Sequence, residues 1–166
     1  MSHIFFRGSV NQLMVLFLST YANKVDRKGR VSVPAPFRTA LVAQPFAGIV
    51  LFRSGTHACL EGFPYAAMEE LATRLDHYDL FSAAQDDLAT TIFAEAVQVP
   101  FDPEGRVVIA EQLLRHAAID DQALFVGMGR KFQIWNPAAY EMRCDQARRQ
   151  VRDQGLTLPR RAGEAA

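Results

Sequence analysis

Short apolar runs recur in the same order in two parts of the chain. In the first part, alternating apolar and polar residues flank residues 26–30 and predict a strand, a tight turn and a second strand. Phe37 and Leu41 lie four residues apart after Pro34, which predicts a short helix. The apolar run 48–52 and the segment 58–63 then predict a hairpin of two strands.

The second part repeats this series. It contains, in order, strand 97–99, a turn at 102–105, strand 107–109, a helix at about 112–117, strand 123–126 and strand 131–135. A fixed order of elements that occurs twice indicates one structural module used twice. The pattern therefore predicts an α+β chain with a mainly β core and helices, organised as two equivalent modules.

Helical spacing follows each hairpin and also separates the modules. Apolar residues recur every three or four positions at Met68, Leu71, Leu75 and Tyr78, and again at Tyr140, Cys144, Ala147 and Val151. Residues 86–96 predict a linking helix, because Asp86 and Asp87 suit the positive end of a helix dipole.

The two turns share a motif. DRKGR at residues 26–30 and DPEGR at residues 102–106 each place Asp four residues before Arg and Gly directly before that Arg. Asp at the first position, Gly at the fourth and Pro103 at the second position of the later copy suit type I turns. We therefore assign structural roles in the turns to four residues: Asp26, Gly29, Asp102 and Gly105.

Charge is distributed unevenly, although the formal net charge is zero. Residues 1–53 contain seven Lys and Arg against one acid, residues 54–104 contain one Arg against ten acids, and residues 105–166 contain ten against seven. Local charge rather than the total steers a charged partner. The first turn is the most basic short segment, which favours a polyanionic partner there.

Candidate DNA-contacting residues are Lys24, Arg27, Lys28, Arg30 and Arg106. Lys and Arg neutralise phosphates, and an Arg side chain can donate two parallel hydrogen bonds to guanine. Arg30 is the leading candidate. For Arg106, pairing within the turn is an equally good interpretation, because Glu104 is beside it, and Arg27 and Lys28 are as compatible with solvated loop charges.

Other functional classes find less support in the sequence. The histidines at 57, 77 and 116 fall in different predicted elements, the acidic runs lack histidine partners, and we expect no metal, no cofactor and no catalysis. Cys59 and Cys144 suggest two buried thiols in a reducing cytosol, and the apolar run 13–18 is too short to cross a membrane. An alternative that remains is an oligomeric scaffold without DNA reading, in which acidic and basic segments pair subunits.

The core and the late basic residues have simpler interpretations. Phe37, Leu41 and Trp135 fit a core, and Arg38 could brace its helix against a turn carboxylate. Five late arginines suggest a solvated surface rather than a second DNA site: Arg148, Arg149, Arg152, Arg160 and Arg161.

Together, the segments FLSTYANKVDRKGRVSVPAPFR, DPEGRVVIA and LFVGMGRKFQIWNP make the chain resemble the MraZ family, bacterial regulators of the division and cell-wall gene cluster. The resemblance covers residues 17–151. It implies tandem SpoVT/AbrB-like swapped-hairpin repeats that form a pseudo-dimeric β-barrel within one chain. It also implies a ring-shaped homo-oligomer that binds double-stranded DNA at short repeats upstream of its own operon, in the cytoplasm and at the nucleoid.

The resemblance divides the chain into five segments: an N-terminal extension at 1–16, a first repeat at 17–67, a helical linker at 68–95, a second repeat at 96–139, and a C-terminal helix and tail at 140–166. Met14 is a candidate start. Family members often carry Arg in the linker helix, where this chain has Asp86, Asp87 and Thr90.

Overall fold

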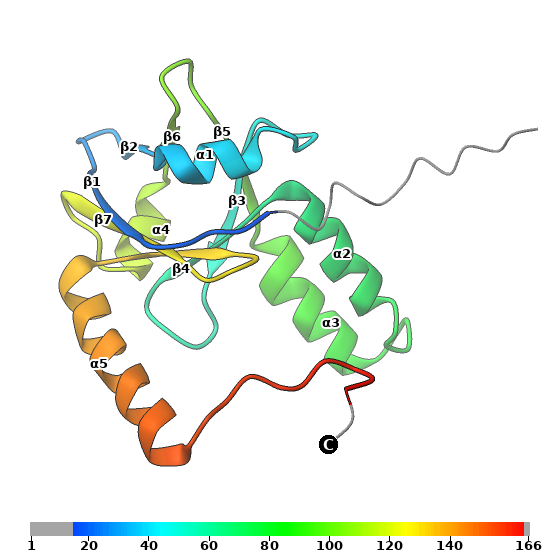
Figure 1. The fold of residues 1–166 in the computed structure, drawn as a ribbon. Helices are drawn as coiled ribbons and strands as arrows, with labels where there is room; N and C mark the ends of the chain where they lie inside the picture. Colours follow the sequence, from blue (N-terminus) through cyan, green and yellow to red (C-terminus); the bar gives the residue numbers. More distant parts are fainter. Residues whose placement is uncertain (1–14, 165–166) are drawn as a thin grey trace, which may run out of the picture.

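A computed structural model, which describes residues 15–164, contains two successive modules with the same order of elements (Figure 1). The first comprises β1 (Thr20–Lys24), β2 (Arg30–Ser32), α1 (Ala35–Leu41), β3 (Gly48–Arg53), β4 (Leu60–Phe63) and α2 (Tyr65–Leu75). The second comprises β5 (Val97–Pro100), β6 (Arg106–Val108), α4 (Glu111–His116), β7 (Gln122–Gly127), β8 (Phe132–Trp135) and α5 (Pro137–Gln154). The predicted α+β class is confirmed.

The linker between the modules is helical, as predicted, but its bounds differ from the expected 86–96. Helix α3 spans Ala83–Ala89 and continues into a π-helical turn, η1, at Thr90–Ala94. The helix begins earlier because the Ser82 side chain accepts a hydrogen bond from the Gln85 backbone N–H at 3.2 Å, which satisfies one of the free donors at the helix start. Tyr78, expected on α2, lies beyond its end.

The modules exchange strands. The six-stranded sheet has the order β1-β7-β8-β4-β3-β5, so β1 of the first module pairs with β7 of the second and β5 pairs with β3. The central pair, β4 with β8, also joins the two modules. Neither module can therefore complete the sheet alone, and the chain is a swapped pair of equivalent halves.

The closed barrel that the resemblance implied is not confirmed. The sheet ends at β1 and β5, while β2 and β6 form a separate two-stranded antiparallel ribbon. Each of these ribbon strands has three residues. An isolated antiparallel β-bridge pairs Val25 with Val31, the residues on either side of the first turn. The strands before and after each turn thus belong to different sheets.

The main core lies between the six-stranded sheet, the ribbon and the short helices α1 and α4. Phe17, Phe37 and Phe132 pack with ring centroids 5.0 to 5.4 Å apart, and the Phe37 ring also contacts Phe125. Val31 and Val107 bury the inner face of the ribbon against this cluster. The core positions predicted for Phe37, Leu41 and Trp135 are confirmed.

The helices after the two hairpins lie at different sides of the molecule. Figure 1 shows α5 descending on one side of the sheet, and α2 and α3 packed side by side on the other. Within residues 15–164, no helix is long and apolar enough to cross a membrane. Of the predicted extension at 1–16, residues 1–14, which include the candidate start at Met14, lie outside this range.

Candidate nucleic-acid interface

The first DRKGR turn is organised by the Asp26 carboxylate. Its Oδ1 atom accepts hydrogen bonds from the backbone N–H groups of Lys28 at 2.9 Å and Arg30 at 3.0 Å, and its Oδ2 atom accepts one from Arg30 Nε at 2.6 Å. The Gly29 N–H donates to the Asp26 carbonyl at 3.0 Å and closes the turn. One side chain therefore fixes both the loop backbone and the direction of the arginine.

The second turn repeats this geometry around Asp102. Oδ1 accepts from the N–H groups of Glu104 and Arg106, both at 2.9 Å, and Oδ2 accepts from Arg106 Nε at 2.7 Å. Gly29 and Gly105 have φ angles of +79° and +76°, a region that only glycine adopts without strain. The motif therefore produces the same turn twice despite different residues at its second and third positions.

The same hydrogen bonds keep both carboxylates ionised. The backbone N–H of Arg30 is the largest influence lowering the pKa of Asp26 below its ordinary 3.8, and the backbone N–H of Arg106 does the same for Asp102. The hydrogen bond to Asp102 raises the pKa of Arg106. Because the folded carboxyl pKa values are depressed, the turn contacts are complete near neutral pH and are lost only as the pH falls below about 4.

Each turn is held against the opposite module. The Ile109 N–H donates to the Gly29 carbonyl at 2.9 Å, and the Val33 N–H donates to the Gly105 carbonyl at 3.2 Å. Arg38 donates to the carbonyl of Val33 and lies over Gly105. The expectation that Arg38 meets a turn carboxylate is therefore wrong: its hydrogen-bond partner is a backbone carbonyl, because the Asp102 carboxylate is already occupied within its own turn.

The β2–β6 ribbon brings the two arginines to one face. Arg30 pairs with Val108, and Ser32 pairs with Arg106. Side chains alternate along a strand, and the residues between these four, Val31 and Val107, face the core, so all four face outward. Arg30 and Arg106 are diagonal neighbours on this face, with a typical spacing of about 7–8 Å.

The two arginines differ in what remains available to a ligand. The side chain of Arg106 also pairs through Nη2 with Glu104 Oε2 at 3.2 Å. For Arg30, only Nε has a partner within residues 15–164, and both Nη atoms lack one. Both side chains are about one-third exposed, at 37% and 33%, so the difference lies in the pairing rather than in accessibility.

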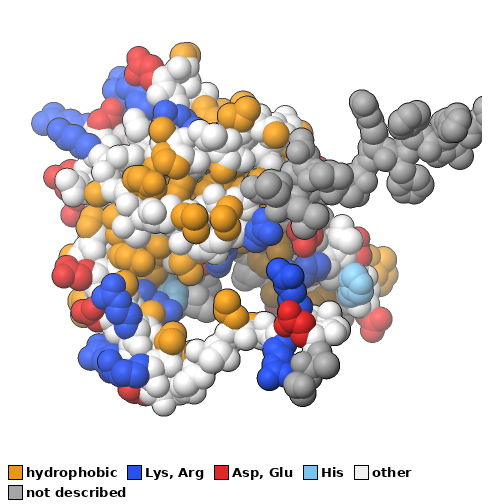
Figure 2. Space-filling model, in the orientation of Figure 1, with side chains coloured by type: hydrophobic (Ala, Val, Ile, Leu, Met, Phe, Trp, Pro, Cys, Tyr) orange, Lys and Arg blue, Asp and Glu red, His pale blue; other side chains and the backbone are white. Residues whose placement is uncertain are grey.

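The other predicted basic residues surround the first turn. Lys24 ends β1, and Arg27 and Lys28 occupy the two middle positions of the turn, all three exposed. None of the three forms an ion pair with another residue in the described range. Figure 2 shows Lys and Arg side chains projecting at the upper left, where Figure 1 draws this turn, with acidic side chains among them.

Ser32 and Val108 are additional members of the outward face. Val108 is 55% exposed. Ser32 lies two residues after Arg30, and Val108 lies two residues after Arg106, so the alternation of side chains along a strand is a sequence signal that places each on the same face as that arginine. The pairing of β2 with β6 could not be found this way, since it joins segments far apart in the chain.

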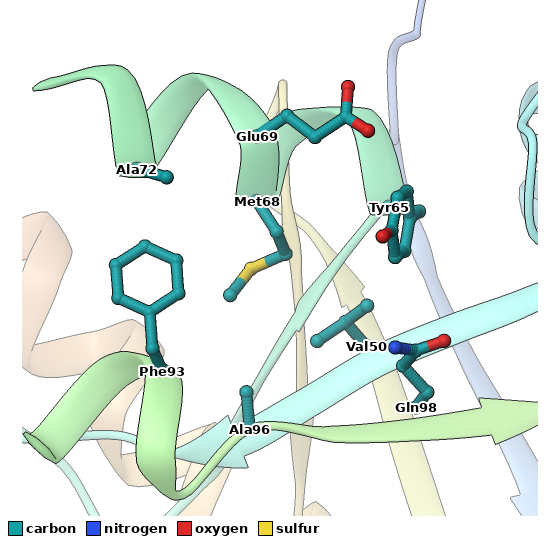
Figure 3. Close-up of a pocket in the computed structure, with 8 residues that line it drawn as sticks. All are labelled: Val50, Tyr65, Met68, Glu69, Ala72, Phe93, Ala96 and Gln98. Carbon is teal, nitrogen blue, oxygen red and sulfur yellow. The ribbon is translucent and has the colours of Figure 1, made fainter. Parts of the chain in front are cut away.

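Other features offer weaker sites. A cavity of about 280 Å³ lies between α2, η1 and the strands β3 and β5; Figure 3 shows Met68 and Phe93 pointing into it and the Glu69 carboxylate directed away. Its lining is mainly apolar and contains no pair of titratable groups suited to catalysis. Among the described residues, no three His, Cys, Asp or Glu side chains gather as a metal site.

The cysteines differ from the expectation of two buried thiols. Cys59 is fully buried, and burial together with the nearby Glu61 raises its pKa to about 12. Cys144 is only partly buried on α5. The late arginines 148, 149 and 152 are exposed on α5, and Arg160 and Arg161 are exposed beyond it.

Comparison with known proteins matches this architecture to one family. The family model described as "MraZ protein, putative antitoxin-like" matches residues 16–90 and 92–155. A protein named transcriptional regulator MraZ from Gluconacetobacter diazotrophicus is 46% identical over 92% of this chain and 99% of its own length. Proteins of the same name from Gluconobacter oxydans and Rickettsia akari are 44% and 40% identical over 92% and 87% of this chain, and over 93% and 97% of their own lengths. On these matches, which span both modules, the chain belongs to the MraZ family.

Proposed function

We propose that the protein is a transcriptional regulator that binds double-stranded DNA through the outward face of the β2–β6 ribbon and the first turn. The relatives' printed name, transcriptional regulator, supports the regulatory role. The observation that carries the proposed DNA contact is the state of Arg30, whose Nε is fixed by Asp26 while both Nη atoms lack a partner among the described residues.

This arrangement suits recognition of a base or a phosphate. The Asp26 contact restricts the long arginine side chain before DNA arrives, so less conformational entropy is lost on binding. The two Nη groups can still donate parallel hydrogen bonds to guanine O6 and N7 or to phosphate oxygens. Lys24, Arg27 and Lys28 then add phosphate contacts, while Asp26, Gly29, Asp102 and Gly105 preserve the turns.

The biological target follows from the family. We propose that the protein binds short direct repeats upstream of its own operon, in the division and cell-wall gene cluster, as a ring-shaped oligomer at the nucleoid. Several first turns in one ring would contact successive repeats, and linked weak contacts raise the overall affinity.

Mobility-shift titration with DNA from upstream of the protein's own gene tests the DNA contact. We expect Arg30→Ala to weaken binding about 10-fold or more, because a good arginine–base contact contributes about 1–3 kcal/mol. Arg106→Ala should weaken binding less, since Glu104 competes for that side chain. Conversely, Glu104→Ala should strengthen binding, because it removes a negative charge and releases Arg106 Nη2.

Arg152→Ala is the matched control, because Arg152 is an exposed arginine on α5 paired with Asp153 at 3.3 Å. An Arg30→Ala variant that remains folded and binds as tightly as this control would disprove the role of Arg30. Arg30→Lys separates charge from geometry: it keeps one positive charge but cannot donate the parallel pair, so it should lose sequence preference more than total affinity.

The alternative function is an oligomeric scaffold that binds protein and reads no DNA. The uneven charge along the chain favours it as a second candidate. The two functions predict different salt dependence. Specific DNA binding should weaken steeply as salt increases, because phosphate contacts release counterions, whereas absence of any salt-dependent DNA binding would support the scaffold.

A further inference from the structure

We propose that copies of this chain assemble head to tail, with an apolar knob on one copy seated in the groove beside α5 of the next. The knob consists of Leu80 and Phe81 in the connection between α2 and α3. This inference deepens the assembly part of the proposed function and rests on it.

Within one copy of the chain, both knob residues are largely exposed to solvent. Phe81 is 96% exposed and Leu80 is 71% exposed, and the two residues lie directly before the N-terminal cap of α3. Large apolar side chains that gather at the surface mark interaction sites. Four exposed carboxylates flank the knob, at Asp76, Asp79, Asp86 and Asp87, against one exposed arginine, Arg74, at the end of α2.

The groove beside α5 offers space for the knob. It has a volume of about 620 Å³ and lies between the β3–β4 connection and residues 139–149 of α5. Trp135, Ala139 and Met142 provide apolar lining, and Met142 is 75% exposed. The groove is therefore large enough to receive an aromatic side chain and its neighbour.

The groove is basic where the knob is acidic. Arg143 and Arg149 line it, and neither forms an ion pair with another residue in the described part of the chain. The acid in the lining, Asp145, is paired with Arg148 at 3.5 Å. An acidic knob that enters this groove would thus meet two arginines that have no ion-pair partner among the described residues, which favours the complementary pairing and opposes pairing of two knobs or two grooves.

The two surfaces belong to different sides of the molecule. In Figure 1, the connection between α2 and α3 and the helix α5 lie on opposite sides of the sheet. A knob therefore meets the groove of a second copy, and each copy keeps one knob and one groove for further neighbours. Such a heterologous contact extends until it closes into a ring or grows as a filament.

Two variants that each remove one surface test the contact, with molecular mass measured by light scattering in the absence of DNA. The knob variant carries Leu80→Ser and Phe81→Ser; the groove variant carries Met142→Glu and Arg149→Glu. We expect the wild type to form a large assembly and each variant alone to run as a monomer. An equimolar mixture should form a species of two chains and no larger one, because only one intact knob and one intact groove meet.

Val42→Ser is the control, since Val42 is also 81% exposed but follows α1, away from both surfaces. A monomeric wild type, variants that keep the wild-type mass, or variants that form no mixed pair would each overturn the inference. Circular dichroism confirms that both variants are folded before they are compared.

The outcome separates this contact from the DNA proposal. An assembly that requires the knob and the groove but fails to bind upstream DNA would contradict the proposed function and leave the contact intact. If the variants keep both the molecular mass and the DNA affinity of the wild type, the result would contradict the knob–groove contact and leave the proposed DNA binding intact.

Discussion

At the residue scale, the one Asp and the one Gly of each motif determine the backbone conformation of the turn. The Asp26 carboxylate accepts hydrogen bonds from the backbone N–H groups of Lys28 and Arg30 as well as from Arg30 Nε, and Gly29 adopts a φ of +79° with its α-carbon against the opposite module. A β-carbon at Gly29 would lie 2.5 Å from the carbonyl oxygen of Ile109. The turn is thus restricted both by its own conformation and by its neighbour.

Gly29→Ala should therefore destabilise the protein. The left-handed conformation and the clash with a backbone oxygen together predict a loss of about 1–3 kcal/mol, measurable by urea unfolding. Gly55→Ala is the control, because a β-carbon there meets nothing within 4 Å and the residue has no positive φ. Equal stability of the two variants would contradict the role assigned to Gly29.

At the element scale, the junction of β4 and β8 contains a buried polar network. Glu61 lies opposite Gln133 and accepts a hydrogen bond from its Nε2 at 3.0 Å and another from Lys131 Nζ at 2.9 Å. Gln133 Oε1 in turn accepts from Trp135 Nε1 at 2.9 Å. Glu61 and Gln133 are only 6% exposed, so each group depends on its partner for the hydrogen bonds that water would otherwise provide.

Because the two residues come from different modules, the network also favours pairing between unlike halves. Two copies of β4 would place two Glu61 carboxylates together without Lys131. Two copies of β8 would place Lys131 residues together without a carboxylate. The charge pattern is therefore complementary in the pairing that the structure shows.

Gln133→Glu tests this element. It removes the amide donor and places a second carboxylate beside Glu61, so we expect the free energy of unfolding to fall by about 2–4 kcal/mol at neutral pH. Gln122→Glu, an exposed change of the same kind at the start of β7, should have little effect. Comparable midpoints in denaturant for the two variants would show that the network is not required.

At the scale of the whole molecule, strand exchange makes the two modules one folding unit. Removing the first module would leave β7 without β1 and β8 without β4, and the second module has no replacement for either. Main-core residues also come from both halves, including Phe37 and Phe125. We therefore expect a single unfolding transition rather than two.

The one tryptophan, Trp135, reports on the second module and makes this testable. Phe37→Leu, a buried change in the first module, should lower stability by about 1–3 kcal/mol and shift Trp135 fluorescence and far-ultraviolet circular dichroism equally. Val42→Ser, an exposed change just after the same helix, should shift neither signal. A fluorescence midpoint unaffected by Phe37→Leu would mean that the modules unfold separately.

Local sequence patterns were sufficient for the repeated order of elements, the shape of both turns and the apolar core. These features depend on neighbouring residues: Asp and Gly at fixed spacing define a turn, and apolar periodicity defines a strand or a helix. The exchange of β1 and β5 between modules depends instead on contacts between residues about 100 or 50 positions apart, which local propensity does not encode. For the same reason, the tertiary structure alone placed Arg30 and Arg106 on one face and oriented the knob and the groove to opposite sides.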